Sequence, residues 1–198
     1  KISDLLSKKR YLRSNRDRFL CFFVEANASV IQHSSVYKDA DGVFNCALTG
    51  EQKLSITNLY LANSDQLSQG SSILLSKKNV SVNDAVPALG VPAIVFFNSL
   101  KHHIENRDID YSVILRLNCE GVEDDVIYAA HQIFSDRLAL VMGSLKDVQG
   151  CKGDVAYDAL EKFLHLNNLP CISFSSDINS WFNAHNAIHD LCKNRFEL

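Results

Sequence analysis

The sequence predicts an α/β fold with a Rossmann-like, mostly parallel sheet and helices on both of its faces. Two observations support this prediction. Short apolar segments typical of buried parallel strands recur along the chain. Amphipathic helical segments of about 10–15 residues alternate with them, as in βαβ units. With 198 residues and 46% hydrophobic side chains, the chain can bury a full core, and we expect a single domain over residues 1–198.

Composition narrows the classes of function. A net charge of −3 argues against nucleic acid as the main partner, since phosphate binding needs a dense basic surface. The basic cluster Lys8–Arg18 is interpreted as a solvated helix face. No apolar run approaches the ~18–20 residues that span a bilayer, and no signal peptide opens the chain. Six scattered cysteines without a Cys-x-x-Cys pair favour a reducing cytoplasm. We expect a cytoplasmic protein or a domain of a larger one.

The first elements follow from residue pattern. Residues 1–18 are expected to form a short helix and an exposed connection. Phe19–Glu25 is an apolar run closed by an acid, which is typical of a buried parallel strand, and a helix is expected to begin at Asn27. The segments that follow are expected to be a short strand at Val43–Leu48, a half-exposed antiparallel strand at Lys53–Tyr60, a polar loop at 62–72 and an irregular stretch at Ser81–Gly90.

The second half of the chain alternates between apolar strands and amphipathic helices. Strands are predicted at Val91–Phe97, Tyr111–Leu117, Arg137–Met142 and Pro170–Phe174. Helices are predicted at Ser99–Asn106 with Asn98 as its cap, and at Val122–Phe134, Val155–Leu166 and Asp177–Phe196.

The turn after Tyr111–Leu117 is the first candidate site. Asn118, Glu120 and Glu123 follow the strand within six residues. Ligands of open α/β sheets bind in the crevice beyond the carboxyl ends of parallel strands. The alternative is an ordinary strand-to-helix turn in which Asn118 caps the helix and the acids favour its N-terminal dipole.

Glu25 is a second candidate, because it ends the strand predicted at Phe19–Glu25. In nucleotide-binding βαβ units an acid at the end of the second strand accepts hydrogen bonds from ribose hydroxyls. The alternative is an acid that favours the N-terminus of the following helix.

Other catalytic constellations find little support. His185 and His189 share the spacing of a metal pair on a helix, but no third ligand accompanies them. The chain has neither a Gly-x-Ser-x-Gly nucleophile elbow nor a P-loop. The cysteines have no consistent histidine partner. Hydrolase, kinase and metalloenzyme functions are therefore disfavoured, and no metal site is predicted.

Several segments, in order, resemble the FkbM-type family of S-adenosylmethionine-dependent methyltransferases. The most specific is Leu115–Glu123, which is close to the family's Leu-Lys-Ile-Asp-x-Glu-Gly-x-Glu. The weaker matches are Phe23–Asn27, Cys46–Thr49, Gly70–Ser72 and Pro92–Leu100, and together the matches span about residues 19–185.

The resemblance implies a cofactor, a substrate class and roles for residues. S-Adenosylmethionine would be the methyl donor, and a hydroxyl of a sugar or related compound the acceptor. Glu25, in a turn with Asn27, would hold the ribose, and Ala47 would lie at the adenine edge. Asn118 and Glu120, with Glu123 in the same motif, would orient or deprotonate the acceptor.

The chain departs from the family pattern in two places. The family's first strand ends in Asp-x-Gly-Ala-Asn-x-Gly, whereas this chain has no glycine before Gly42. We therefore expect the fold to lack the usual first strand and glycine-rich loop, with residues 2–10 as the remainder of the first crossover helix. Asn118 and Arg116 also replace an Asp and a Lys, and an amide cannot act as a general base. A catalytically inactive interaction or scaffold domain is the alternative function.

Overall fold

The computed structural model describes residues 19–62, 70–174 and, near the C-terminus, 183, 186–188, 190, 191 and 193. The elements in the N-terminal half are β1 (Phe22–Val24), α3 (Ala28–His33), the 3₁₀ helix η2 (Ser35–Asp39), β2 (Gly42–Phe44), β3 (Ala47–Thr49), β4 (Ser55–Ala62) and β5 (Val80–Pro92). Those that follow are α4 (Ala93–Glu105), β6 (Val113–Leu117), α5 (Glu123–Phe134), the 3₁₀ helix η3 (Ser135–Arg137), β7 (Leu138–Gly143), α6 (Lys146–Lys152), α7 (Asp154–Leu166) and β8 (Cys171–Ser173). The predicted α/β class is confirmed.

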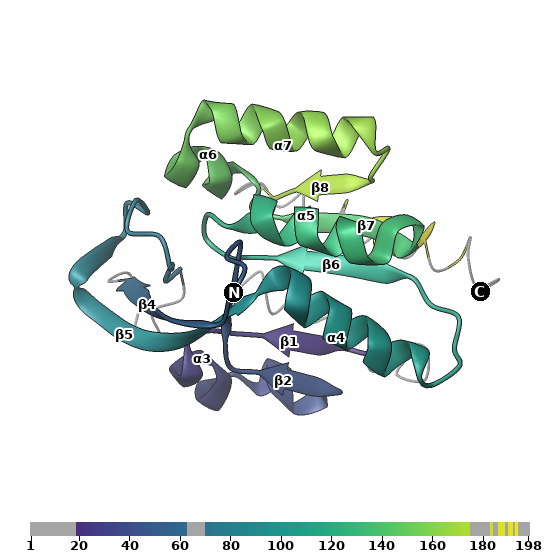
Figure 1. Ribbon diagram of the computed structural model, residues 1–198, viewed down its shortest axis with the longest axis horizontal. Coiled ribbons are helices and arrows are strands. Elements are labelled where there is room, and N and C mark those ends of the chain that lie inside the picture. Colours follow the sequence, from purple (N-terminus) through teal and green to yellow (C-terminus); the bar gives the residue numbers. More distant parts are fainter. Residues whose placement is uncertain are drawn as a thin grey trace.

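The strands form three hydrogen-bonded ladders, most of whose pairings are parallel. β1 pairs with β2, and β6–β7–β8 form a second parallel ladder. In the third ladder β5 pairs in parallel with β3 and antiparallel with β4. Figure 1 shows α4 and α5 crossing one face of this strand array, with α6 and α7 beside β8. The arrangement is a mostly parallel, Rossmann-like sheet flanked by helices.

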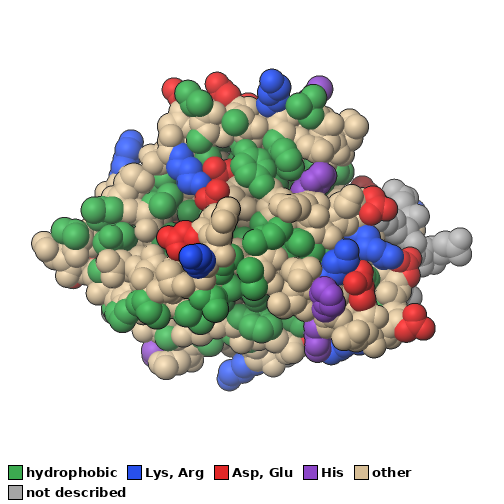
Figure 2. Space-filling view, in the orientation of Figure 1, with side chains coloured by type: hydrophobic (Ala, Val, Ile, Leu, Met, Phe, Trp, Pro, Cys, Tyr) green, Lys and Arg blue, Asp and Glu red, His purple; other side chains and the backbone are tan. Residues whose placement is uncertain are grey.

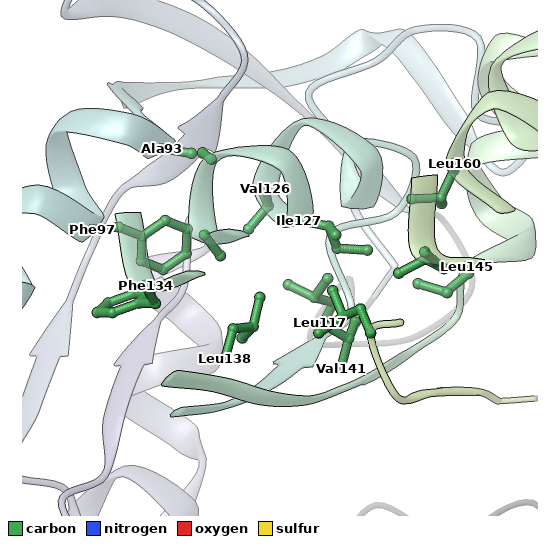
Figure 3. Close-up of a cluster of buried hydrophobic side chains, with 14 of the residues drawn as sticks. Ala93, Phe97, Leu117, Val126, Ile127, Phe134, Leu138, Val141, Leu145 and Leu160 are labelled. Atoms are coloured by element: carbon green, nitrogen blue, oxygen red, sulfur yellow. The ribbon is translucent and has the colours of Figure 1, made fainter. Parts of the chain in front are cut away.

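The main core lies between β6–β7 and the helices α4, α5 and α7. β7 is buried along its whole length, as expected of a central parallel strand. Val126 and Ile127 of α5 are fully buried against Leu117 and Val141 of the two strands, and Figure 3 shows these side chains meeting between helix and sheet. Alternate residues of the same strands, Leu140 and Met142 among them, form a smaller cluster on the opposite face. That cluster includes Ile188 from the C-terminal segment.

The predicted elements from Tyr111 to Phe174 are confirmed. β6, α5, β7, α7 and β8 all lie within a few residues of their predicted bounds. Helix α6 was not predicted, because Gly150 and Gly153 were interpreted as a break between two elements. In the structure Gly150 lies within this short helix and Gly153 follows it. In the N-terminal half, β1, α3 and β4 are confirmed, and Asn27 caps α3. The predictions for residues 1–18 and most of 62–72 and Asp177–Phe196 fall outside the described residues, as do His185 and His189.

The interpretation of residues 81–98 was wrong, whereas the helix predicted at Ser99–Asn106 is confirmed as the later part of α4. Ser81–Gly90 is not irregular but belongs to β5, whose ladder with β4 runs from Ser55–Gly90 to Ala62–Val80. The strand predicted at Val91–Phe97 ends at Pro92, and α4 begins at Ala93 instead of after Asn98. A run of seven apolar residues fits a strand and a buried helix equally well. The core positions Ala93, Phe97 and Ile104 have helical spacing.

The strand predicted at Val43–Leu48 is also wrong, because it is two strands in different ladders. β2 ends at Phe44 beside β1, and β3 begins at Ala47 beside β5. Asn45 lies at the crossing, where its side-chain amide donates to the carbonyls of Glu25 (2.8 Å) and Ala26 (3.1 Å). The chain therefore passes from one ladder to the other at Asn45, whose side chain links the end of β2 to the end of β1.

The surface over β5 and the start of α4 is rich in hydrophobic side chains (Figure 2). The exposed large hydrophobic residues of these two elements are Val82, Val86, Leu89 and Val95. None of the described helices is long and apolar enough to cross a bilayer.

The candidate site is built on β1 and β6, which belong to different ladders. In Figure 1 their arrows point the same way, so their carboxyl ends lie at one end of the sheet. Within residues 19–62 and 70–174, no strand pairs with β1 on the side away from β2 or with β6 on the side away from β7. The turns after these two strands carry Glu25 and Asn118–Glu123.

Candidate functional site

The β6–α5 turn is organised around the Glu123 carboxylate. Oε1 accepts hydrogen bonds from the backbone amides of Cys119 and Glu120, and Oε2 accepts one from Gly121, each at 2.8 Å. Glu123 is fully buried. Burial raises the pKa of its carboxyl, and the backbone hydrogen bonds oppose that shift. Glu123 therefore stabilises the turn by accepting hydrogen bonds from three of its backbone amides.

Glu120 lies at the tip of the same turn in the left-handed region, with φ of 58°. Its Oε2 lies 2.5 Å from Lys77 Nζ, and its Oε1 accepts a hydrogen bond from Asn118 Nδ2 at 3.2 Å. The carboxylate is thus paired with a cation on one side and orients an amide on the other. The side chain of Asn118 itself is exposed.

Lys77 comes from the segment that leads into β5 and joins three parts of the fold. Its amino group also contacts Asp147 Oδ1 of α6 at 2.7 Å. Burial would lower the pKa of Lys77, but the hydrogen bonds to Asp147 and Glu120 outweigh burial and raise it. The cation consequently stays charged and holds the β6–α5 turn to the start of α6.

Two further contacts fix the turn from its sides. The buried Ser72 donates its hydroxyl to the Glu120 carbonyl at 2.8 Å and accepts the Leu74 amide. Gly121 has φ of 119°, and a methyl group at this position would lie 2.6 Å from Cys151 Sγ. Glycine is needed here both for its backbone conformation and for close packing.

The Glu25 carboxylate ends β1 and has two partners of its own. Oε1 accepts the backbone amide of Asn27 at 2.8 Å, and Oε2 accepts the Tyr37 hydroxyl at 3.3 Å. Burial raises the pKa of Glu25, and these hydrogen bonds oppose the shift. Asn27 is buried, and its side chain caps α3 by accepting the Ser29 amide.

The turns after β1 and β6 are close enough for their charges to interact. Burial chiefly raises the pKa of the Cys119 thiol, and the carboxylates of Glu123 and Glu25 are among the charges that add to the shift. Burial likewise lowers the pKa of the Arg116 guanidinium, which interacts electrostatically with Tyr37. The two turns therefore lie near each other at the carboxyl ends of β1 and β6.

Ala47 belongs to a different ladder from β1, although Asn45, two residues before it, is hydrogen-bonded to the carbonyls of Glu25 and Ala26. It is buried in β3, opposite Gly90 of β5. The structure thus brings Glu25 and Asn27 together at one turn and Asn118, Glu120 and Glu123 at another, and it places Ala47 in a different ladder.

Sequence reasoning missed several residues that support the turn. Lys77 and Asp147 lie 70 residues apart in sequence, and no local pattern links them. Tyr37 falls in a short 3₁₀ helix with no periodic signal. Ser72 was noted only as part of a loop. Arg116 was noted for its identity, but its lack of a partner is visible only in three dimensions.

Comparison with known proteins returned no match to this chain among family models, curated proteins or solved structures. Among the described residues, no three His, Cys, Asp or Glu side chains gather in a group that could hold a metal ion.

Proposed function

We propose that this chain is an S-adenosylmethionine-dependent O-methyltransferase-like domain that acts on a hydroxyl of a sugar or related compound. The observation that carries the proposal is the Glu25 carboxylate at the end of β1, near enough to the Asn118–Glu123 turn of β6 to raise the pKa of the Cys119 thiol. Both turns lie at the end of a parallel sheet where α/β proteins bind their ligands. The free thiols of the described cysteines favour the cytoplasm as its location.

The residues at Glu25 suit the ribose end of such a cofactor. An ionised carboxylate offers about four lone-pair sites, and the Glu25 carboxylate accepts protein hydrogen bonds from Asn27, Tyr37 and Ala26. A remaining lone pair could accept a hydrogen bond from a ribose hydroxyl. Asn27 would hold the turn in place by capping α3, and Ala47 would contribute an apolar edge for adenine. The methionine end would need a glycine-rich loop that the printed sequence does not contain, so no residue is assigned to it.

The residues on β6 would position the acceptor. The cofactor would supply an electrophilic methyl group, and in-line transfer depends mainly on orientation. Because Asn118 Nδ2 donates to Glu120, Asn118 Oδ1 is the atom that would accept a hydrogen bond from the acceptor hydroxyl. Glu120 would orient Asn118, and Lys77 would hold Glu120. Glu123 would act as a positioning residue through the three amides it binds.

A catalytically inactive interaction or scaffold domain is the second candidate, and a specific observation favours it. Asn118 is an amide, Glu120 is paired with Lys77, and the oxygens of Glu123 are engaged by backbone. None of these three residues is therefore a free general base. An active enzyme would have to use orientation alone or a base other than these three residues.

Methyl transfer from labelled S-adenosylmethionine to a panel of saccharides separates the two candidates. The enzyme proposal predicts transfer by the wild-type chain, with a loss of tenfold or more in Asn118→Ala at unchanged S-adenosylhomocysteine affinity. Asn98→Ala, an exposed change on α4, is the control. Binding of S-adenosylhomocysteine without transfer to any saccharide would favour the scaffold function.

A further inference from the structure

A cavity of about 300 Å³ lies between α7 and β8, which are neighbours in Figure 1. None of its lining residues belongs to the turns after β1 and β6. The volume is at the lower end of the range for ligand pockets in proteins, roughly 300–1,000 Å³, so the cavity suits a small molecule. The residues that line it are Leu145, Tyr157, Leu160, Glu161, Leu164, Cys171 and Ser173.

The periods of the helix and the strand explain this lining. The four α7 residues have the spacing of a single helix face, and Cys171 and Ser173 are alternate residues of β8 that share one face of the strand. Ile172, between them, packs in the cluster on the opposite face of the sheet. Among the described strands β8 pairs with β7 alone. The cavity therefore lies at the edge of this ladder.

The inner wall of the cavity is apolar. Leu145, Leu160 and Leu164 are buried, with 3%, 0% and 8% of their surface exposed. Figure 3 shows the side chains of Leu145 and Leu160 close to one another. Burying apolar surface is favourable in proportion to the area removed from water. The inner part of the cavity therefore suits a hydrocarbon group.

The polar groups lie at the mouth of the cavity. Glu161 and Ser173 are exposed, whereas Tyr157 and Cys171 are half-buried. Tyr157 lies one helical turn before Glu161, and its hydroxyl donates a hydrogen bond to that carboxylate. Burial and this hydrogen bond raise the pKa of Tyr157 to about 12. Tyr157 therefore stays protonated at neutral pH and helps to hold Glu161 at the mouth.

The charge of Glu161 has no counterpart within the described part of the chain. Among the described residues that line the cavity it is the only charged one, and none of the ion pairs between described residues includes it. The cavity thus combines an unpaired negative charge at its mouth with an apolar interior. A complementary ligand has a positive charge at one end and a hydrocarbon group at the other.

We propose that this cavity binds a small organic cation, a primary ammonium group carried on a short hydrocarbon chain. The ammonium group has three N–H donors. It would donate to the Glu161 carboxylate and to the Ser173 hydroxyl oxygen, and the chain would pack against Leu145, Leu160 and Leu164. The inference does not depend on the methyltransferase proposal, because the two sites share no residue.

The test is calorimetric titration of the full chain at pH 7 with hexylamine, 1-hexanol and hexanoate. These compounds share a hydrocarbon chain of similar length and differ in the charge of the head group. Wild type should bind hexylamine about fivefold or more tightly than 1-hexanol, and hexanoate most weakly, because Glu161 attracts the cation and repels the anion. Equal affinity for the three compounds, or no binding of hexylamine at millimolar concentration, would overturn the inference.

Two variants locate the ligand. Glu161→Gln keeps the size of the side chain but removes its charge, so it should lower the affinity for hexylamine to that for 1-hexanol. Asp158→Asn, at an exposed carboxylate of α7 outside the lining, is the matched control and should bind hexylamine as wild type does. Ser173→Phe places a ring at the mouth and should abolish binding, with folding verified by urea denaturation. Equal hexylamine affinity in wild type and Glu161→Gln, or binding retained in folded Ser173→Phe, would contradict the proposed site.

Discussion

Lys77 Nζ and Glu120 Oε2 lie 2.5 Å apart and join the segment before β5 to the turn after β6. Both side chains are about 85% buried, with 15% and 14% of their surface exposed, and Lys77 also contacts Asp147. The pair holds Glu120 in its left-handed conformation beside Asn118. The candidate acceptor turn is therefore positioned by a residue far away in sequence.

Replacing Lys77 by Met should destabilise the protein. The change removes the cation but keeps the length of the side chain, and it leaves Glu120 and Asp147 without their partner in a partly buried site. We expect a loss of about 2–3 kcal/mol in the free energy of unfolding, measured by urea denaturation. Lys78→Met, at the exposed neighbouring position, should cost less than about 0.5 kcal/mol. Equal losses in the two variants would contradict the role of the ion pair.

The stability contributed by Lys77 should depend on pH in the alkaline range. Its pKa in the folded protein is raised above the ordinary value of 10.5. Its contribution is therefore fully present below 10.5 and is lost as the pH rises through the folded-state pKa. The difference in unfolding free energy between wild type and Lys77→Met should be constant from pH 7 to about 9 and should shrink above about 10.5. A difference that grows above this pH would have the wrong sign.

Glu123→Gln should destabilise the protein more than a typical surface change. The amide keeps one acceptor oxygen, but its NH₂ group would face the backbone amides that the carboxylate now binds. We expect a cost of about 2–3 kcal/mol by chemical denaturation. Asp158→Asn on the exposed face of α7 is the control. A negligible cost for Glu123→Gln would mean that the turn does not depend on this carboxylate.

A double-mutant cycle of Gly121 and Cys151 separates two effects of a side chain at Gly121, the backbone strain and the contact with Cys151. Gly121→Ala should destabilise both through its φ of 119° and through contact with Cys151 Sγ; the backbone part alone is worth about 1–3 kcal/mol. Cys151→Ala removes the contact with Sγ, but the contact with the Cβ atom of residue 151, at 2.8 Å, and the backbone strain both remain. The double variant should therefore recover only part of the loss caused by Gly121→Ala. Full recovery would show that strain at Gly121 is unimportant.

Residue patterns correctly predicted the strands and the longer helices between Tyr111 and Phe174. In these elements the spacing of apolar residues clearly indicates either a strand or a helix. Leu138–Gly143 is apolar throughout and is a buried central strand, and Val126, Ile127 and Ala130 have the helical spacing of a core face. The same reasoning failed at Val91–Phe97, where apolar residues fill both the end of a strand and the start of a helix. Pro92 could begin either element, and only tertiary packing makes Ala93 the first residue of α4.

Non-local pairing accounts for the remaining errors. Ser81–Gly90 was predicted to be irregular, but it pairs with β4 as part of β5. Strand β3 pairs only with Gly90–Pro92, so Pro87 has β4 as its one neighbouring strand. A proline is tolerated at such a position. At the site, Glu25 and Asn118 were identified from their places at strand ends, whereas Lys77 and Tyr37 depend on contacts that no short motif encodes.

The measurement that tests the central proposal most directly is calorimetric titration of the full chain with S-adenosylhomocysteine. We predict saturable binding by wild type and by Glu51→Ala, an exposed control. Glu25→Ala should bind about 10- to 100-fold more weakly, because a charge-assisted hydrogen bond to the ribose is lost. Absence of binding by wild type at millimolar ligand, or equal affinity in wild type and Glu25→Ala, would contradict the proposal that Glu25 forms the ribose end of a cofactor site.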